Sequence, residues 1–163
     1  MRQPSATASI VPAGPLDAPV LASLLRETMG PTAWTEDAVA DLLEHGGGLA
    51  HLAAGRAYGE VMPVGCSLAR VAADEAELLG IGVLAAARGA GVGRRLLDSA
   101  IATAAGRGAQ RMVLEVAADN ATAKAMYHAA GFGAVGARDA YYSDDSGDGT
   151  DAEIFARDLS ATA

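Results

Sequence analysis

The sequence lacks three features that would each indicate a particular class of protein. Cys66 is the only cysteine among the 163 residues, which excludes an intrachain disulfide and a cysteine-rich metal site. No run of about twenty uninterrupted apolar residues is present. Residues 1–14 carry one arginine and no continuous apolar segment. We therefore expect no membrane span and no secretory signal, and a soluble protein of the reducing cytoplasm.

Basic residues are scarce as well. Lysine and arginine number 12 against 20 aspartates and glutamates, which gives a net charge of −8. Because phosphate contacts with basic side chains dominate the affinity for nucleic acids, general nucleic-acid binding is not expected. An acidic surface more often keeps a protein soluble than it marks a partner, although it tolerates a basic one. The sequence also lacks an HExxH motif, and we expect no metal cofactor.

The chain does contain enough apolar sequence for one folded domain. With 163 residues, 51% of them hydrophobic, it is long enough for a single core and too short for two ordinary domains. Residues 1–9 are small and polar with no periodicity, so we expect them to be disordered. One domain is expected over residues 10–160.

Periodicity predicts a mixture of helices and strands. Helices are expected over residues 16–29, from the cap Thr35 to Gly46, from Val92 to Gly106, and from the cap Asn120 to Gly131. Strands are expected over residues 49–54, 64–72, 76–84, 111–117, 133–142 and 152–159. His45, His51 and His128 are interpreted as surface residues.

The most informative stretch is LLGIGVLAAARGAGVGRRLL, residues 78–97. It predicts a strand, a loop and a helix in succession. By the period of two, Leu79, Ile81 and Val83 share one face of the strand. Gly80 and Gly82 would then leave the opposite face with no side chain to block a ligand.

The loop of this stretch has the composition of an anion-binding turn. Gly89, Gly91 and Gly93 leave the main-chain amides at the helix start uncrowded, where the helix dipole favours a phosphate or a diphosphate. A flexible turn is the plainer alternative in a chain with 20 glycines. Arg88 and the arginine pair at positions 94 and 95 favour the phosphate.

The pattern Arg88-x-x-Gly91-x-Gly93, following an apolar strand and opening a helix, resembles the acetyl-coenzyme A (acetyl-CoA) loop of the GCN5-related N-acetyltransferase (GNAT) superfamily. That resemblance implies an α/β (α+β) GNAT fold, in which a mixed, mostly antiparallel central sheet is flanked by helices. It also implies acetyl-CoA as cosubstrate and acetyl transfer to an amine.

Two side chains outside the loop are candidates for this chemistry. Glu115 lies on the apolar strand MVLEV, on the side of Val113 and Ala117. A carboxylate there either has no role and lowers stability, or is an ion-pair partner, or is a general base. We favour the general base. Tyr127 shares the inward face of its helix with residues 123, 126 and 130. It is either a packed core tyrosine or the acid that protonates a leaving thiolate.

The segment LEVAADNATAKAMYHAAGF, residues 114–132, resembles the LEVRxxNxxAxxLYxxxGF signature of the RimI-type ribosomal-protein-alanine N-acetyltransferases. DEAELLGIGV before the loop, and the tyrosine pair at 141–142 before an acidic turn, are similar to the same subgroup. By this resemblance Glu115 is the general base, acting through water, and Tyr127 is the general acid. The resemblance implies that acetyl-CoA is bound by Ile81, Gly82, Val83, Arg88, Gly89, Ala90, Gly91, Val92, Gly93, Arg94, Asn120 and Tyr127.

On the acceptor side, Trp34, Tyr141 and Tyr142 are the candidate substrate-binding residues. Trp34 precedes the helix cap Thr35, and it either packs as a hydrophobic staple or forms the floor of a substrate groove. The chain departs from the subgroup's pattern around this tryptophan, at Gly82 and after the tyrosine pair, which leaves the identity of the acceptor open.

An N-terminal α-amine suits a single carboxylate better than a lysine does. About ten per cent of α-amines are neutral at pH 7, against fewer than about one lysine in a thousand. We therefore expect the acceptor to be the N-terminal α-amine of a protein such as a ribosomal protein, and the enzyme to be a monomer or homodimer. The alternatives are a small-molecule amine or lysine acetyltransferase on the same scaffold, and a non-catalytic acyl-CoA sensor.

Overall fold

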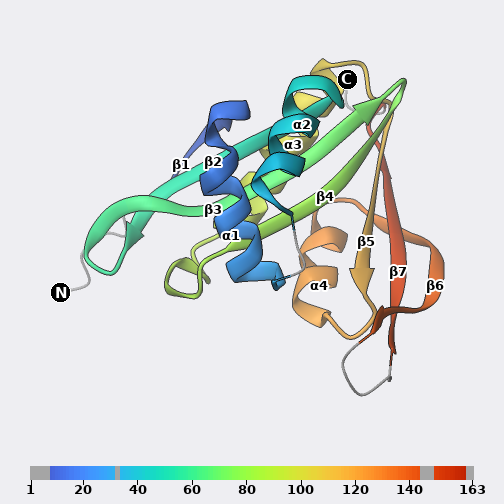
Figure 1. Cartoon of the computed structure of the whole chain (residues 1–163). Helices are drawn as coiled ribbons and strands as arrows, with labels where there is room; N and C mark the ends of the chain where they lie inside the picture. The colour runs from blue at the N-terminus through green and yellow to red at the C-terminus, as the bar shows by residue number, and fades with distance from the viewer. Residues whose placement is uncertain (1–7, 32–33, 144–148, 161–163) are drawn as a thin grey trace.

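The computed structural model describes residues 8–31, 34–143 and 149–160, with side chains at all of these except 139–143 and 149–150. The strands are β1 (Ser9–Ala13), β2 (Gly48–Ala57), β3 (Glu60–Ala72), β4 (Glu75–Val83), β5 (Arg111–Ala117), β6 (Gly133–Ser143) and β7 (Gly149–Asp158). The helices are α1 (Ala18–Met29), α2 (Glu36–His45), α3 (Val92–Gly106) and α4 (Ala121–Ala129), with 3-10 turns η1 (Pro15–Asp17) and η2 (Ala85–Ala87) (Figure 1). The expected helices and strands are thus confirmed, with shifted ends.

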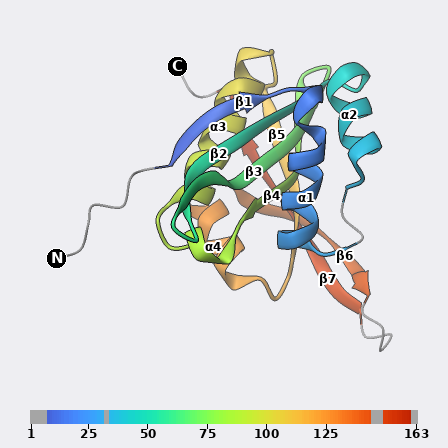
Figure 2. The ribbon, with the colours of Figure 1, turned by 60° about the vertical axis from the view of Figure 1, so that its left-hand side comes forward.

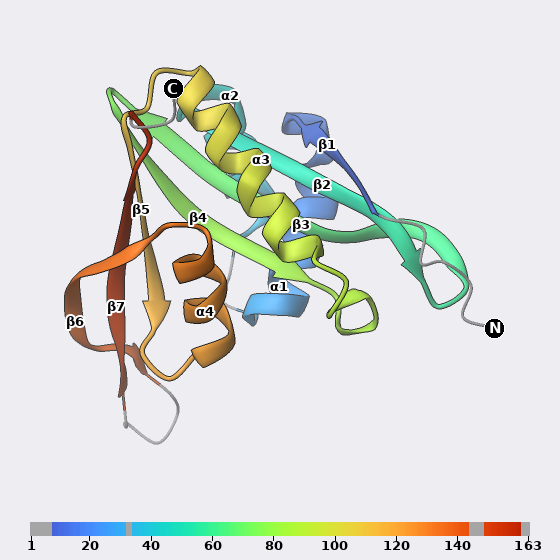
Figure 3. The same ribbon diagram turned by 180° about the vertical axis from the view of Figure 1, so that it is seen from behind.

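The strands of the described residues form a single seven-stranded sheet in the order β1-β2-β3-β4-β5-β7-β6. Every neighbouring pair is antiparallel except β4 and β5, which are parallel. Helices α1 and α2 cover one face of the sheet, and α3 and α4 cover the other (Figures 2 and 3). The expected mixed, mostly antiparallel sheet flanked by helices is confirmed.

The core has one layer on each face of the sheet. Met112 and Phe155 are fully buried in the layer beneath α3 and α4, and Leu25 and Leu68 are fully buried in the layer beneath α1 and α2. The two layers arise because successive strand side chains point to opposite faces and helices supply an apolar stripe to each. The inner strands therefore contribute buried apolar side chains to both layers.

β4 and β5 separate halfway along their length. Their pairing runs from Glu75–Arg111 to Leu78–Leu114. Beyond that point β4 continues to Val83 and β5 to Ala117 without further pairing of the two strands, and the divergence is visible in Figure 3. The sheet thus opens at the carboxyl ends of its two parallel strands, which is where ligands bind in many α/β proteins.

A β-bulge at Leu79 changes which way the β4 side chains point. The register of β4 with β3 shifts by one residue there, which reverses the alternation of faces. Leu79 packs with the layer beneath α1, whereas Ile81 and Val83 pack with the apolar clusters on the α3 side. The expectation that these three residues share one face is therefore wrong for Leu79.

The two glycines of β4 are covered by α1. A Cβ atom on Gly82 would lie 1.9 Å from Thr28 Oγ1, and one on Gly80 would lie 3.0 Å from Met29 Sδ. The face that these glycines were expected to leave open is therefore partly occupied by α1, although both glycines also line a cleft. Gly82 is needed because α1 approaches the strand too closely for a side chain there, whereas a Cβ on Gly80 would be tight only against the flexible ends of the Leu25 and Met29 side chains.

Two expectations about the N-terminal half are also wrong. Ser9, expected to be disordered, begins β1, which pairs with β2, while residues 1–7 lie outside the described residues. His51, expected at the surface, is 5% exposed because β2 is an inner strand with α3 packed on one face and α2 on the other. Alternation along a strand does not reveal whether its second face is also covered.

Candidate active site

A cleft of about 940 Å³ occupies the opening between the diverging ends of β4 and β5. It extends from the first turn of α3 to the side chains of Glu115 and Tyr127. Its lining residues come from four regions of the chain and are Thr28, Met29, Leu78, Leu79, Gly80, Ile81, Gly82, Val83, Ala87, Arg88, Gly89, Gly91, Val92, Gly93, Arg94, Leu114, Glu115, Val116, Ala117, Asn120, Thr122, Ala123, Met126 and Tyr127.

The first turn of α3 offers main-chain amides to the cleft. Gly91, the residue before the helix, has the left-handed conformation with φ +78°, and it provides no side-chain cap. The first main-chain bond of the helix is donated by the Arg95 N–H to Gly91 O, so the amides of residues 92–94 have no partner within the helix. Together with the positive end of the helix dipole they form a site that fits a diphosphate.

Two arginines flank this turn. Arg88 Nε donates to Val83 O at 3.0 Å, and Arg94 Nε lies 3.0 Å from Asp98 Oδ1 one helical turn further on. Both side chains are solvent-exposed enough to move, and both residues line the cleft. They can therefore add positive charge beside an anion that binds the amides.

Glu115 lies on β5 with its side chain on the face covered by α1, opposite to Leu114 and Val116. Its carboxylate is partly buried, with 21% of the side chain exposed, and its Oε1 lies 3.2 Å from Arg138 Nε. Among the alternatives for this residue, the structure shows an ion pair. In this ion pair the arginine contacts one of the two carboxylate oxygens.

Tyr127 is 6% exposed and packs in the core, which is one of the two interpretations that the sequence left open for it. Its ring packs edge-on against Phe132 and Phe155, at centroid distances of 6.0 and 6.3 Å. The same residue lines the cleft from the α4 side. The aromatic contacts fix the ring, and a fixed ring holds its hydroxyl in one place.

Asn120 has a structural role at the start of α4. Its Oδ1 accepts a hydrogen bond from the Ala123 N–H at 3.1 Å, which confirms the expected cap. It also lines the cleft.

Most of the predicted cofactor residues come together in this cleft, but two predicted residues do not line it. Ala90 belongs to the loop and is exposed without contributing to the lining. Trp34 is half-buried against the apolar cluster of α1 and α2. Val39, the fourth residue of α2, belongs to the same cluster. This placement is that of a hydrophobic staple. The side chains of Tyr141 and Tyr142 lie outside the described residues.

Sequence reasoning did not identify Thr28, Met29 and Arg138 as part of this region. Thr28 and Met29 end α1 and line the cleft, and Arg138 reaches Glu115 from β6. No sequence signal marks them, because each is brought to the cleft by long-range packing. Met126 also lines the cleft. The helical spacing that puts it on the same inward face as Tyr127 is the sequence signal for this position.

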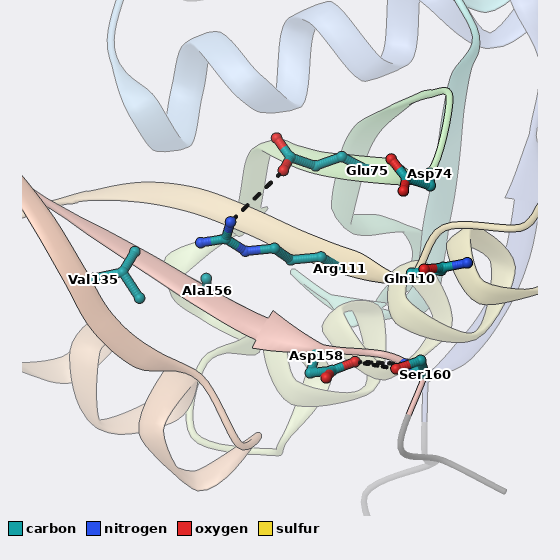
Figure 4. A pocket seen from close by; sticks show the side chains of 8 residues that line it. All are labelled: Asp74, Glu75, Gln110, Arg111, Val135, Ala156, Asp158 and Ser160. Atoms are coloured by element: carbon teal, nitrogen blue, oxygen red, sulfur yellow. Dashed lines mark hydrogen bonds and ion pairs between the residues drawn. The ribbon is translucent and has the colours of Figure 1, made fainter.

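A second, smaller cavity of about 480 Å³ lies at the amino-terminal ends of β4 and β5 (Figure 4). It is lined by Asp74, Glu75, Gln110, Arg111, Val135, Ala156, Asp158 and Ser160. Hydrogen bonds from the side chain and the main chain of Ser160 lower the pKa of Asp158. None of the predicted site residues lies there. In the described parts of the chain, no group of three or more His, Cys, Asp and Glu residues is placed to hold a metal ion, and no helix is long and apolar enough to cross a membrane.

The family comparison decides what kind of protein has this cleft. The sequence model of the Acetyltransferase (GNAT) family matches residues 21–132, which include the glycine loop, Glu115 and Tyr127. The chain belongs to the GNAT family. It is an N-acetyltransferase, and the acetyl donor of this family is acetyl-CoA.

Solved structures of other acetyltransferases share the fold of this GNAT protein. The ribosomal-protein-S18-alanine N-acetyltransferase from Escherichia coli is 28% identical, with 96% of each chain covered and a TM-score of 0.80. NAA60 from Arabidopsis thaliana, solved with acetyl-CoA, is 19% identical over 93% of this chain and 98% of that one, with a TM-score of 0.78. The ribosomal-protein-alanine N-acetyltransferase from Brucella melitensis is 22% identical over 92% and 99%, with a TM-score of 0.73. The comparison with curated protein sequences found no match.

Proposed function

We propose that this GNAT enzyme transfers an acetyl group from acetyl-CoA directly to the N-terminal α-amine of a protein, such as a ribosomal protein. The observation that carries the proposal is that a single cleft joins the open amides of α3, the carboxylate of Glu115 and the ring of Tyr127. Acetyl-CoA supplies the acetyl group there as a thioester.

In this proposal the residues from β4 to α3 bind the cofactor. The amides of residues 92–94 hold the diphosphate, with Arg88, Gly89 and Arg94 beside them. The Leu84 N–H donates to Val64 O at 2.8 Å, toward β3. Because successive N–H groups of an extended chain point to opposite edges, the Val83 N–H points to the edge where β4 and β5 have separated. That amide is the proposed donor to the thioester carbonyl.

Glu115 and Tyr127 are the proposed proton carriers. Glu115 accepts the proton of the acceptor amine through a water molecule, and the Tyr127 hydroxyl donates a proton to the departing sulfur. No covalent intermediate is proposed. Cys66 is fully buried, and burial raises the pKa of its thiol to about 12, so it does not supply a thiolate near neutral pH.

The choice of an α-amine rests on its proton affinity and on the similarity to an α-amine acetyltransferase. An α-amine with a pKa near 8 loses its proton to one partly buried carboxylate more readily than a lysine amine near 10.4 does. The 28% identical Escherichia coli structure is that of a ribosomal-protein-S18-alanine N-acetyltransferase. The similarity covers 96% of both chains, so it is not confined to the glycine loop.

A panel of acceptors tests this proposal through the release of free thiol from acetyl-CoA. The panel holds peptides that begin with alanine, serine or methionine and contain one internal lysine, the same peptides with a blocked N-terminus, a polyamine and an aminoglycoside. We expect turnover only with the free N-terminus. Turnover confined to the blocked peptides would indicate a lysine acetyltransferase. Turnover confined to the small amines would indicate a small-molecule enzyme. Cofactor binding with no turnover on any acceptor would indicate an acyl-CoA sensor.

A further inference from the structure

Arg138 connects the outermost strand β6 with the proposed base on β5. Its Nε lies 3.2 Å from Glu115 Oε1, and the strand β7 runs between the two residues (Figure 3). The Arg138 side chain is 56% exposed, whereas the Glu115 side chain is 21% exposed. An exposed arginine is thus paired with a partly buried carboxylate that lines the cleft.

The strand register explains how an arginine two strands away reaches this carboxylate. Ala152 of β7 pairs with Ala117 of β5 on one side and with Arg138 of β6 on the other. Directly paired residues share a face of the sheet, so Arg138 lies on the same face as Ala117 and Glu115. Ala117 and Ala152 carry single methyl groups, which leave room above β7 for a long side chain. Ala152 is fully buried on this face.

We propose that Arg138 is a positioning residue for acetyl transfer: it holds Oε1 of Glu115 and so directs Oε2 toward the water molecule that carries the proton from the acceptor amine. A carboxylate has two oxygens with several lone pairs, and an arginine on one oxygen leaves the other able to accept from an amine or a water. This inference rests on the proposed role of Glu115 as base.

Orientation is the reason to expect an effect larger than the stability of the pair itself. An exposed ion pair contributes little to folding, because solvent screens it and ordering the side chains costs entropy. The geometry of a reacting group matters much more, since small displacements in a reactive complex reduce rates strongly. Loss of Arg138 is therefore expected to slow transfer while leaving the fold intact.

A double-mutant cycle on transfer rates tests whether Arg138 acts through Glu115. The assay uses the acceptor with the fastest turnover in the panel, whatever its class. We expect Arg138→Gln to lower kcat by about tenfold with an unchanged KM for acetyl-CoA, and Arg138→Lys to recover part of the loss. In the Glu115→Gln background, Arg138→Gln should cost nothing further. An equal loss in both backgrounds would show a structural role and overturn the inference.

A matched control comes from a second exposed cross-strand pair. Arg70 Nη2 lies 2.8 Å from Glu77 Oε2 on β3 and β4, away from the cleft, with 45% of the arginine side chain and 40% of the glutamate side chain exposed. Arg70→Gln should leave kcat unchanged. If Glu115→Gln keeps full activity, the proposed base fails. If Glu115→Gln is inactive while Arg138→Gln has the wild-type kcat, only the positioning role fails.

An NMR measurement tests the contact without any acceptor. The ¹⁵N-labelled full chain is compared with its Glu115→Gln and Glu77→Gln variants, and the Nε–H signals of the arginines are followed. We expect the Arg138 signal to move only in the Glu115→Gln variant, and the Arg70 signal only in the other. An Arg138 signal that stays in place in the Glu115→Gln variant would remove the contact on which the inference rests.

Discussion

The two sides of the cleft are built from different kinds of chemical group. The proposed cofactor side, formed by the end of β4, the glycine loop and the start of α3, is contiguous in the chain and offers main-chain amides. The proposed acceptor side is assembled from the end of α1, the end of β5 and α4, with β6 behind it, and offers side chains. Substitutions that add side-chain atoms at glycines should therefore impair the first side. Substitutions that remove polar side-chain atoms should impair the second.

Replacement of Tyr127 by phenylalanine should have the largest effect. Tyr127→Phe removes one oxygen and keeps the ring contacts with Phe132 and Phe155. We expect kcat to fall by about 10²–10⁴-fold, the range for the loss of a general acid, with little change in the affinity for acetyl-CoA. Steady-state kinetics and calorimetry with acetyl-CoA separate the two quantities. Equal losses in rate and affinity would argue against the acid role.

A methyl group added at Gly82 tests the effect of extra side-chain atoms on the first side of the cleft. In Gly82→Ala the new Cβ would lie 1.9 Å from Thr28 Oγ1 and 2.7 Å from Thr28 Cβ, so α1 must move away from β4. We expect the free energy of unfolding in urea to fall by about 1–3 kcal/mol, as for other overpacked sites. Gly133→Ala is the control, because its Cβ would meet nothing within 4 Å. Equal stability of the two variants would show that α1 yields without cost.

This difference between the two sides explains what the sequence could predict. The helix start at Val92 and the bounds of β5 agree with the expectation because local periodicity and glycine spacing encode them. The inward position of Tyr127 follows from helical spacing in the same way. The family resemblance covered the same local motifs.

Features that depend on packing between distant segments were not predictable. The sequence predicts an open face at Gly80 and Gly82, because nothing in the strand reveals that α1 lies on it. The bulge at Leu79 is invisible to a period-of-two pattern. Arg138 carries no motif, and only the register across β7 brings it to Glu115.

The cofactor side should also respond to a small change at Gly91. Its φ of +78° is costly for any residue with a Cβ, although the space around it is open. We expect Gly91→Ala to lose about 1–2 kcal/mol, seen as weaker binding of acetyl-CoA, lower stability or both. Gly106→Ala, at the end of the same helix with open space and no positive φ, should be neutral or slightly stabilising. Similar behaviour of the two variants in calorimetry and urea unfolding would contradict the conformational argument.

The smallest expected effect is the pH dependence of stability that arises from His51, which lies beneath α3. His51 Nε2 lies 3.1 Å from Thr103 Oγ1 of α3, and burial, together with the nearby charge of Arg107, lowers the pKa of His51. The folded protein therefore binds a proton here less readily than the unfolded chain does. The contribution of neutral His51 is fully present above about pH 6.5, the ordinary histidine value, and is lost as the pH falls below it.

The His51→Gln variant isolates this contribution, because glutamine keeps a polar group but does not titrate. The difference in free energy of unfolding between wild type and variant should shrink as the pH falls from about 7.5 to about 5, by less than about 1 kcal/mol. Urea unfolding at several pH values measures it, and Cys66→Ser serves as a buried-site comparison because burial keeps the Cys66 thiol neutral throughout this range. A difference that stays constant with pH would mean that the imidazole takes up protons equally in the folded and unfolded states. In that case the packing of α3 on β2 would be insensitive to acid over this range.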